Sequence, residues 1–178
     1  MGRVLVTPRG EAIIRPAALE DVEAFRALRL ESLRLHAEAF GQDHAAAAAE
    51  GVDYWVDRLR QNTGDAGAIF FAEAGEGLVG MVGVRLGYAP KAAHNALIWG
   101  VYVRAEWRGL KVADTMIESC IDWAAGRGAR LVKLAVVTTN TAAIRCYARC
   151  GFTVYGIEPE ALLVNGMYHD ELLMTRRL

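Results

Sequence analysis

The segment from residue 95 to residue 125 constrains the fold of this chain more than any other stretch. It begins with the apolar run Ala96–Val103, whose length suits a buried strand. After a short polar loop, apolar residues recur at helical spacing from Val112 to Ala124. A buried strand that feeds an amphipathic helix is typical of a crossover connection, so we expect a sheet with helices packed against it.

Hydrophobic periodicity and turn residues predict the other elements in the same way. The helix expected over 19–36 carries its apolar residues near one face and its charges elsewhere; that face comprises Leu19, Val22, Phe25, Leu28 and Leu33. Strands are expected at 11–17, 67–74, 77–86, 96–103, 129–137, 152–157 and 166–178, and further helices at 52–62, 112–124 and 140–151. Hairpins and crossovers are both present, which predicts one mixed sheet with helices on both faces.

The composition limits the class of protein. The chain has 178 residues, of which 53% are hydrophobic and 23% charged, and a formal net charge of -1. These values are typical of a globular chain and give no support for a nucleic-acid or membrane partner. We expect residues 1–10 to form a flexible leader and residues 11–178 to form a single domain.

Three cysteines, Cys120, Cys146 and Cys150, are too few and too unevenly placed for a disulfide framework. Their sparse use favours a reducing compartment, so we expect a cytoplasmic protein. Cys146 and Cys150 stand four residues apart on an expected helix, but the sequence places no His or Cys partner at ligand spacing nearby. We therefore expect buried small hydrophobic residues and no metal.

The loop between strand and helix, Arg108 to Ala113, has two interpretations. The first amides of a helix lack internal acceptors, and the helix dipole adds partial positive charge, so the loop could bind a phosphate. Arg108 and Lys111 would add cationic side chains at the same place. The loop could equally be an ordinary turn with solvated cations, and the hexapeptide alone does not decide between the two.

A second segment favours the phosphate site. Residues 140–152 read Asn-x-x-Ala-x-x-x-Tyr-x-x-x-Gly-Phe, and the earlier loop reads Arg-Gly-Leu-Lys-Val-Ala from Arg108 to Ala113. Together these segments resemble the GNAT superfamily of acyl-CoA-dependent N-acyltransferases. The resemblance implies an α/β (α+β) fold with a mixed, mostly antiparallel sheet of about seven strands. It also implies direct attack of a primary amine on the thioester of acetyl-CoA, the co-substrate.

The resemblance also implies roles for individual residues. The backbone amides of the loop would hold the pyrophosphate, the strand edge would hydrogen-bond the pantetheine arm, and Asn140 would touch that arm. Tyr147 would protonate the departing thiolate, as a catalytic acid, or would be an ordinary core tyrosine. The residues expected to bind the cofactor are Val101, Tyr102, Val103, Arg108, Gly109, Leu110, Lys111, Val112, Ala113, Asn140, Ala143 and Tyr147.

Two positions depart from the family pattern. Lys111 stands where the loop usually has its second glycine. A lysine there still offers its N–H to a phosphate provided that its φ is negative, and its ammonium would either pair with a phosphate oxygen or point to solvent beside a looser loop. Many relatives have a glutamate base near position 99, where this chain has Trp99. Candidate bases elsewhere are Glu31, Glu73, His169, Asp170 and Glu171, although a water relay could also serve.

The amine acceptor is expected between the first two helices and the final hairpin. Candidate acceptor residues are Glu31, Phe40, Trp99, Tyr168 and Asp170. The acceptor itself, a small molecule or a peptide, is not identified by the sequence, and a homodimer is left open. The alternative to an enzyme is a non-catalytic acyl-CoA sensor or interaction module on the same fold.

Overall fold

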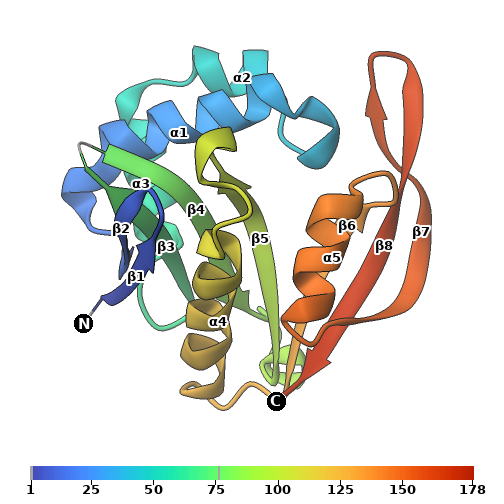
Figure 1. Ribbon diagram of the computed structural model, residues 1–178. Coiled ribbons are helices and arrows are strands. Elements are labelled where there is room, and N and C mark those ends of the chain that lie inside the picture. The colour runs from blue at the N-terminus through green and yellow to red at the C-terminus, as the bar shows by residue number, and fades with distance from the viewer. Residues whose placement is uncertain (1, 76) are drawn as a thin grey trace.

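The computed structural model describes residues 2–75 and 77–178. Its centre is an eight-stranded sheet in the order β1-β2-β3-β4-β5-β6-β8-β7 (Figure 1). The strands are β1 Arg3–Thr7, β2 Gly10–Pro16, β3 Gly67–Ala74, β4 Gly77–Leu86, β5 Asn95–Val103, β6 Leu131–Val137, β7 Thr153–Val164 and β8 Met167–Arg177. The mixed fold with a mostly antiparallel sheet is therefore as predicted, with one more strand than the seven expected.

Helices cover the sheet on both faces, as the periodicity predicted. The α-helices are α1 Val22–Leu35, α2 His44–Ala49, α3 Val52–Gln61, α4 Val112–Ala125 and α5 Thr141–Arg149. Short 3-10 helices are η1 Leu19–Asp21, η2 Ala37–Ala39, η3 Pro90–Ala92 and η4 Ala105–Trp107. Within residues 2–75 and 77–178, no helix is long and apolar enough to span a membrane.

The two faces of the sheet have separate hydrophobic cores. On one face, α4 buries Met116, Ile117 and Cys120 against the strands, and α5 packs beside it. On the other face, α1 and α3 meet through Phe25 and Trp55, whose rings pack edge to face at 5.7 Å. The sheet is thus held rigidly between two layers of helices, which fixes the ends of its strands in space.

The pairing of β5 is the feature that creates a site. All neighbouring strands are antiparallel except β5 and β6, which are parallel and pair only over 95–97 and 131–133. Beyond that point the two strands separate. A bulge also interrupts the pairing of β5 with β4 between Trp99 and Tyr102, where Gly100 has a φ of 65°. Glycine adopts that conformation without a steric cost.

The N-terminal residues do not form the flexible leader that we expected. Arg3–Thr7 is strand β1, which pairs with β2 through a tight turn closed by the Thr7 hydroxyl, a donor to the Gly10 carbonyl at 2.7 Å. Arg3 also forms an ion pair with Asp122 of α4. The sequence does offer a signal for this hairpin, because Pro8 stands at the second position of the turn, where proline is favoured.

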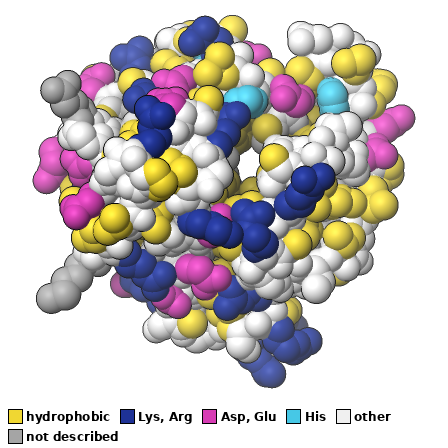
Figure 2. Space-filling model, in the orientation of Figure 1, with side chains coloured by type: hydrophobic (Ala, Val, Ile, Leu, Met, Phe, Trp, Pro, Cys, Tyr) yellow, Lys and Arg dark blue, Asp and Glu magenta, His cyan; other side chains and the backbone are white. Residues whose placement is uncertain are grey.

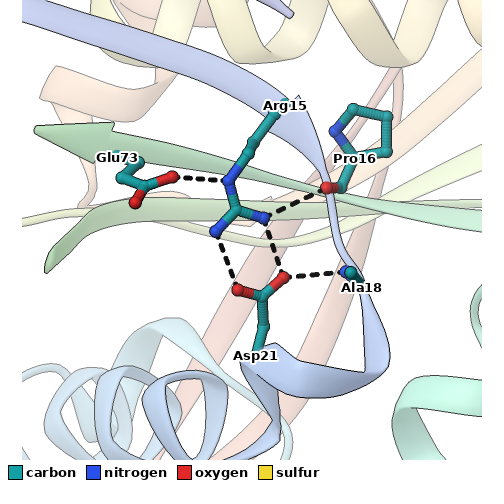
Figure 3. Close-up of polar contacts among 5 residues, drawn as sticks. All are labelled: Arg15, Pro16, Ala18, Asp21 and Glu73. Carbon is teal, nitrogen blue, oxygen red and sulfur yellow. Dashed lines mark hydrogen bonds and ion pairs between the residues drawn. The ribbon is translucent and has the colours of Figure 1, made fainter.

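Helix α1 is anchored to the sheet through one arginine. The guanidinium of Arg15 on β2 donates to both carboxylate oxygens of Asp21, at 2.7 and 2.8 Å, and to Glu73 on β3 at 2.5 Å (Figure 3). Asp21 also accepts from the backbone N–H of Ala18. Because Asp21 immediately precedes α1, this network fixes where the helix begins. It also engages Glu73, one of the predicted bases, far from the separation of β5 and β6.

Candidate active site

A cavity of about 480 Å³ lies where β5 and β6 separate. The loop after β5, the start of α4 and one face of α5 complete its walls, and Figure 2 shows a hollow with Lys and Arg side chains gathered beside it. Every residue predicted to bind the cofactor lines this main cavity except Leu110. Those that do are Val101, Tyr102, Val103, Arg108, Gly109, Lys111, Val112, Ala113, Asn140, Ala143 and Tyr147.

The edge of β5 that faces the cavity offers backbone hydrogen-bonding groups. Beyond Leu97 this edge has no partner strand in the described structure, because β6 has moved away. The carbonyl of Val103 is an exception, since it accepts from Nε of Arg108 at 2.9 Å. An extended ligand arm could therefore pair with β5 as a strand would, and Arg108 would have to release Val103 for the pairing to reach the end of the strand.

The loop before α4 presents a row of backbone donors. In the described structure, the amides of residues 109–114 donate to no backbone or side-chain acceptor, and the first bond of the helix runs from Thr115 N to the Lys111 carbonyl. Gly109 has a φ of 75°. These donors, together with the positive end of the helix dipole, suit the pyrophosphate of acetyl-CoA.

Lys111 does not meet the condition of a negative φ, because its φ is 66°. It therefore takes the left-handed conformation that the family's glycine would adopt freely, at a cost of about 1–2 kcal/mol for a residue with a Cβ. Its ammonium lies 3.4 Å from the carboxylate of Asp114 and is largely exposed. The backbone geometry of the loop is thus retained without the glycine.

Asn140 and Tyr147 occupy opposite ends of α5. Asn140 is the N-cap, and its side-chain oxygen accepts from the N–H of Ala143 at 3.2 Å. The Tyr147 ring is 6% exposed and packs edge to face with Phe152. No described residue forms a hydrogen bond with its hydroxyl, which belongs to a side chain that lines the cavity. Burial raises the pKa of Tyr147 above its ordinary value, so the hydroxyl carries its proton at neutral pH.

The two cysteines of α5 have a partner that the sequence did not suggest. The Sγ atoms of Cys146 and Cys150 and one oxygen of Asp114, on α4, all lie within 4.8 Å of one another. Asp114 is already held by Arg149, at 3.0 and 3.1 Å, and by Lys111. Contact with Cys150, burial and the Asp114 charge all raise the pKa of the Cys146 thiol, so it is not a reactive thiolate.

Two predicted acceptor residues, Phe40 and Trp99, also line the main cavity. The Trp99 ring lies across Gly83 of β4, where a Cβ would come within 2.1 Å of the indole. Trp99 therefore occupies the position of the family's glutamate as a large side chain that needs a glycine beneath it. It cannot serve as a base.

Glu31 lies in a side cavity of about 420 Å³ that adjoins the main one. Its carboxylate accepts from the Tyr102 hydroxyl at 2.8 Å and from Arg104 at 2.8–3.2 Å. Burial opposes its charge, but the hydrogen bonds from Arg104 and Tyr102 outweigh burial and lower the pKa of Glu31. Burial and Glu31 in turn raise the pKa of Tyr102 to about 12. A carboxylate held in this way is a weak base.

His36 lines both cavities, and sequence reasoning missed it. Its Nε2 lies 2.8 Å from Nη2 of Arg108, which must be the donor because a guanidinium has no acceptor. The position of His36 at the end of α1 gave no motif that could have identified it. Tyr102 and Arg108 line both cavities in the same way.

The remaining candidates lie on the final hairpin and line neither cavity in the described structure. Asp170 accepts from the backbone N–H of Glu160 at 2.8 Å, and Tyr168 is 62% exposed. Glu171 stands opposite Glu158 across β7 and β8, and burial together with that charge raises its pKa. His169 pairs with Leu162 in the same hairpin. These placements favour structural roles in the hairpin.

The geometry is supported by sequence comparison. The model of the Acetyltransferase (GNAT) family matches residues 26–152, which is more than half of the chain. This chain belongs to the GNAT family of acetyltransferases. It is an enzyme that uses acetyl-CoA to acetylate an amine. The GNAT fold accounts for the separated strands, the amide-lined loop and the cavity between them.

Individual GNAT proteins resemble the whole chain. This chain is 28% identical over 171 residues to the L-amino acid N-acetyltransferase AaaT of Escherichia coli, and the match covers 93% of this chain and 98% of that protein. A GNAT acetyltransferase from Streptococcus pneumoniae superposes with a TM-score of 0.83 at 20% identity, over 94% and 99% of the two chains. The acetyltransferase yncA of Salmonella typhimurium, solved with acetyl-CoA, gives 0.82 at 20% identity, over 94% of each chain.

Proposed function

We propose that this enzyme transfers the acetyl group of acetyl-CoA to the amino group of a small amino acid. The observation that carries the proposal is the single cavity that joins the amide-lined loop, the free edge of β5 and the apolar side chains Phe40 and Trp99. Similarity to a protein named as an L-amino acid N-acetyltransferase supports the acceptor class.

The residues of the cavity fit acetyl-CoA. The amides of residues 109–114 have no acceptor of their own in the described structure, so they can bind a pyrophosphate without breaking an existing bond. The edge of β5 from Ile98 to Val103 can pair with the pantetheine arm and orient the thioester carbonyl. Acetyl-CoA supplies the activated acetyl group, and the chain supplies position, hydrogen bonds and a proton.

The acid in this proposal is Tyr147. When an amine attacks the thioester directly, the carbon–nitrogen bond forms, the carbon–sulfur bond breaks, and the thiolate needs a proton. The Tyr147 hydroxyl is protonated at neutral pH and belongs to a side chain that lines the cavity. For the amine, water takes up the proton, since Glu31 is held by Arg104 and Tyr102 and Nε2 of His36 accepts from Arg108.

A thiol-release assay tests the proposal. The purified chain is incubated with acetyl-CoA and, separately, with each of a panel of L-amino acids, polyamines, aminoglycosides and lysine-containing peptides. Free CoA is measured against the rate without acceptor, and products are identified by mass spectrometry. N-acetylation of at least one L-amino acid well above the other classes is expected. No acetylated product from any L-amino acid would overturn the proposal.

A further inference from the structure

Arg29 on α1 is the most buried charged side chain in the described structure, with 4% of its surface exposed. The sequence reasoning placed the charges of this helix off its apolar face, although position 29 lies four residues after Phe25 and four before Leu33, and so on that face. Its Nε donates to Oε1 of Gln42 at 3.2 Å, while its Nη1 is buried and has no hydrogen-bond partner among the described residues. A buried donor without an acceptor is costly, and native structures usually have a reason for one.

No described carboxylate balances this charge. Arg29 and Arg58 form no ion pair in the described structure. Arg15 and Arg104, by contrast, both form ion pairs with carboxylates. Burial, and then the nearby charge of Arg58, lower the pKa of Arg29 to about 10, so it still carries its charge at neutral pH. Two guanidinium groups therefore lie close together without an anion.

A chain of hydrogen bonds holds these two groups in place. Gln42 accepts from Arg29 and donates to the Tyr54 hydroxyl at 3.2 Å, which also accepts from Nη1 of Arg58 at 3.1 Å. Two further donors, Nε of Arg58 and Nε1 of Trp99, are buried without acceptors in the described structure. The Arg58 guanidinium lies 5.7 Å from the centre of the Trp99 ring. The cluster thus consists of fixed donors that lack a shared acceptor.

The cluster lies directly behind the bulge of β5. A Cβ on Gly100 would be 3.6 Å from Nη1 of Arg29, and Gly100 lines the main cavity. Gly100 lies within the strand edge from Ile98 to Val103 that is proposed to orient the thioester. The Phe40 ring, which also lines the cavity, stacks 4.7 Å from the Arg29 guanidinium. An anion that reaches Arg29 past this ring is therefore only a few bonds from the point of acetyl transfer.

We propose that Arg29, supported by Arg58 and the Trp99 indole, binds the carboxylate of the acceptor, and that the acceptor is a free α-amino acid. In an α-amino acid one carbon separates the carboxylate from the amine, which matches the short span from Arg29 to the edge of β5. A polyamine or an aminoglycoside would bring positive charge to two guanidinium groups. A peptide N-terminus has no carboxylate next to its amine. The Phe40 ring moves aside when the carboxylate binds.

This inference rests on the proposed function, and the test separates the two. L-leucine is the probe, because Phe40 and Trp99 give the cavity an apolar side, and L-leucinamide is its uncharged counterpart. The wild-type protein, Arg29→Gln and Arg29→Lys are compared by kcat/KM for both substrates. The ratio of the two substrates is compared between proteins, so the different basicity of the two amines cancels.

The wild-type protein should favour L-leucine, and Arg29→Gln should reduce its kcat/KM by roughly 10- to 100-fold, as expected for a lost charged hydrogen bond. The value for L-leucinamide and the KM for acetyl-CoA should change little. Arg29→Lys should recover part of the preference. Arg34→Gln, at an exposed position on the same helix, is the matched control and should leave the ratio unchanged.

Arg58→Gln covers the case in which Arg29→Gln does not fold, because Arg58 is only partly buried. It should lower the preference for L-leucine in the same direction by a smaller factor. If wild-type protein acetylates L-leucine and neither variant that folds changes the ratio, Arg29 does not bind the carboxylate. If no L-amino acid is acetylated, the proposed function fails and this inference fails with it.

Discussion

The two sides of the main cavity are built in different ways. The side proposed to bind the cofactor, here called the cofactor wall, comprises residues 101–103, 108–114 and α5. It offers mainly backbone groups whose directions are fixed by a strand edge, a left-handed loop and a helix start. The side proposed to bind the acceptor, here called the acceptor wall, presents the side chains of Phe40 and Trp99 to the cavity. Arg29, Gln42 and Arg58 support these two rings from behind and do not line the cavity in the described structure.

This difference explains what each wall can recognise. Backbone amides cannot be changed by substitution, so they suit a cofactor shared by a whole family. Side chains from separate elements can be exchanged one at a time, and they therefore suit an acceptor that differs between relatives. Variants of the cofactor wall should change turnover with every acceptor, whereas variants of the acceptor wall should change the ratio between acceptors.

Tyr147→Phe should have the largest effect and should act on all acceptors alike. It removes the hydroxyl and keeps the ring, so acetyl-CoA affinity should hold while turnover falls by about 10²- to 10⁴-fold. Single-turnover rates and acetyl-CoA titration on one preparation measure both quantities. Tyr155→Phe, at an exposed tyrosine on β7, is the control. A variant with normal turnover and a lower melting temperature would make Tyr147 a core residue only.

Gly83→Ala should disturb the acceptor wall alone. Its new Cβ would meet the Trp99 ring at 2.1 Å, so the ring must move, at a cost of about 3 kcal/mol of unfolding free energy. The KM for the amino acid should rise while the KM for acetyl-CoA stays the same. Gly77→Ala on the same strand, where a Cβ meets no described atom within 4 Å, is the control. Equal changes in both KM values would contradict the separation of the two walls.

Asp21→Asn should weaken the anchor of α1 without changing the preference between acceptors. Losing the charged bonds to Arg15 should cost about 2 kcal/mol at pH 7. Hydrogen bonding to Arg15 lowers the pKa of Asp21, so its contribution is present above the ordinary aspartate pKa and is lost as the pH falls through the lowered value.

Urea unfolding of both proteins between pH 7 and pH 2 measures the effect of Asp21→Asn. The difference between their free energies of unfolding should narrow only below about pH 4. Asp57→Asn, whose exposed carboxylate lies 3.7 Å from Arg60, should show almost no gap at any pH. A gap that stays constant down to pH 2 would show that the charge of Asp21 is not what anchors the helix.

Lys111→Gly should have the smallest effect, and the effect should be a gain in stability. Glycine removes the left-handed strain but raises the entropy of the unfolded chain, which leaves a net gain of about 0.5–1 kcal/mol. At low salt the variant should bind acetyl-CoA a few-fold more weakly than the wild-type protein. The difference should shrink as salt rises, because salt screens the attraction of the Lys111 ammonium for the phosphates. Lys111→Arg keeps both charge and Cβ and should resemble the wild-type protein. A loss of stability in Lys111→Gly would contradict the strain.

The residues predicted to bind the cofactor line one cavity with the exception of Leu110, whereas most of the predicted acceptor residues and bases do not line that cavity. A backbone cradle needs particular residues at fixed spacing, and the positions from Asn140 to Phe152 and the pair Arg108–Gly109 are visible in one chain. The left-handed φ of Lys111 could not be predicted from the sequence, because lysine rarely adopts that conformation. Arg29 was grouped with the other charges because of its residue type, although its spacing from Phe25 and Leu33 places it on the apolar face, where it is buried.

The three-residue contact between β5 and β6 has a mechanical consequence. Strands β1–β5 form one half of the sheet and β6, β8 and β7 the other, and the ladder joins them only over 95–97 and 131–133. A pantetheine arm laid along β5 would extend that ladder as an additional strand, so the cofactor would stiffen the joint between the halves. Amide hydrogens from Ile98 to Val103 that face the cavity should then exchange with deuterium more slowly when acetyl-CoA is bound.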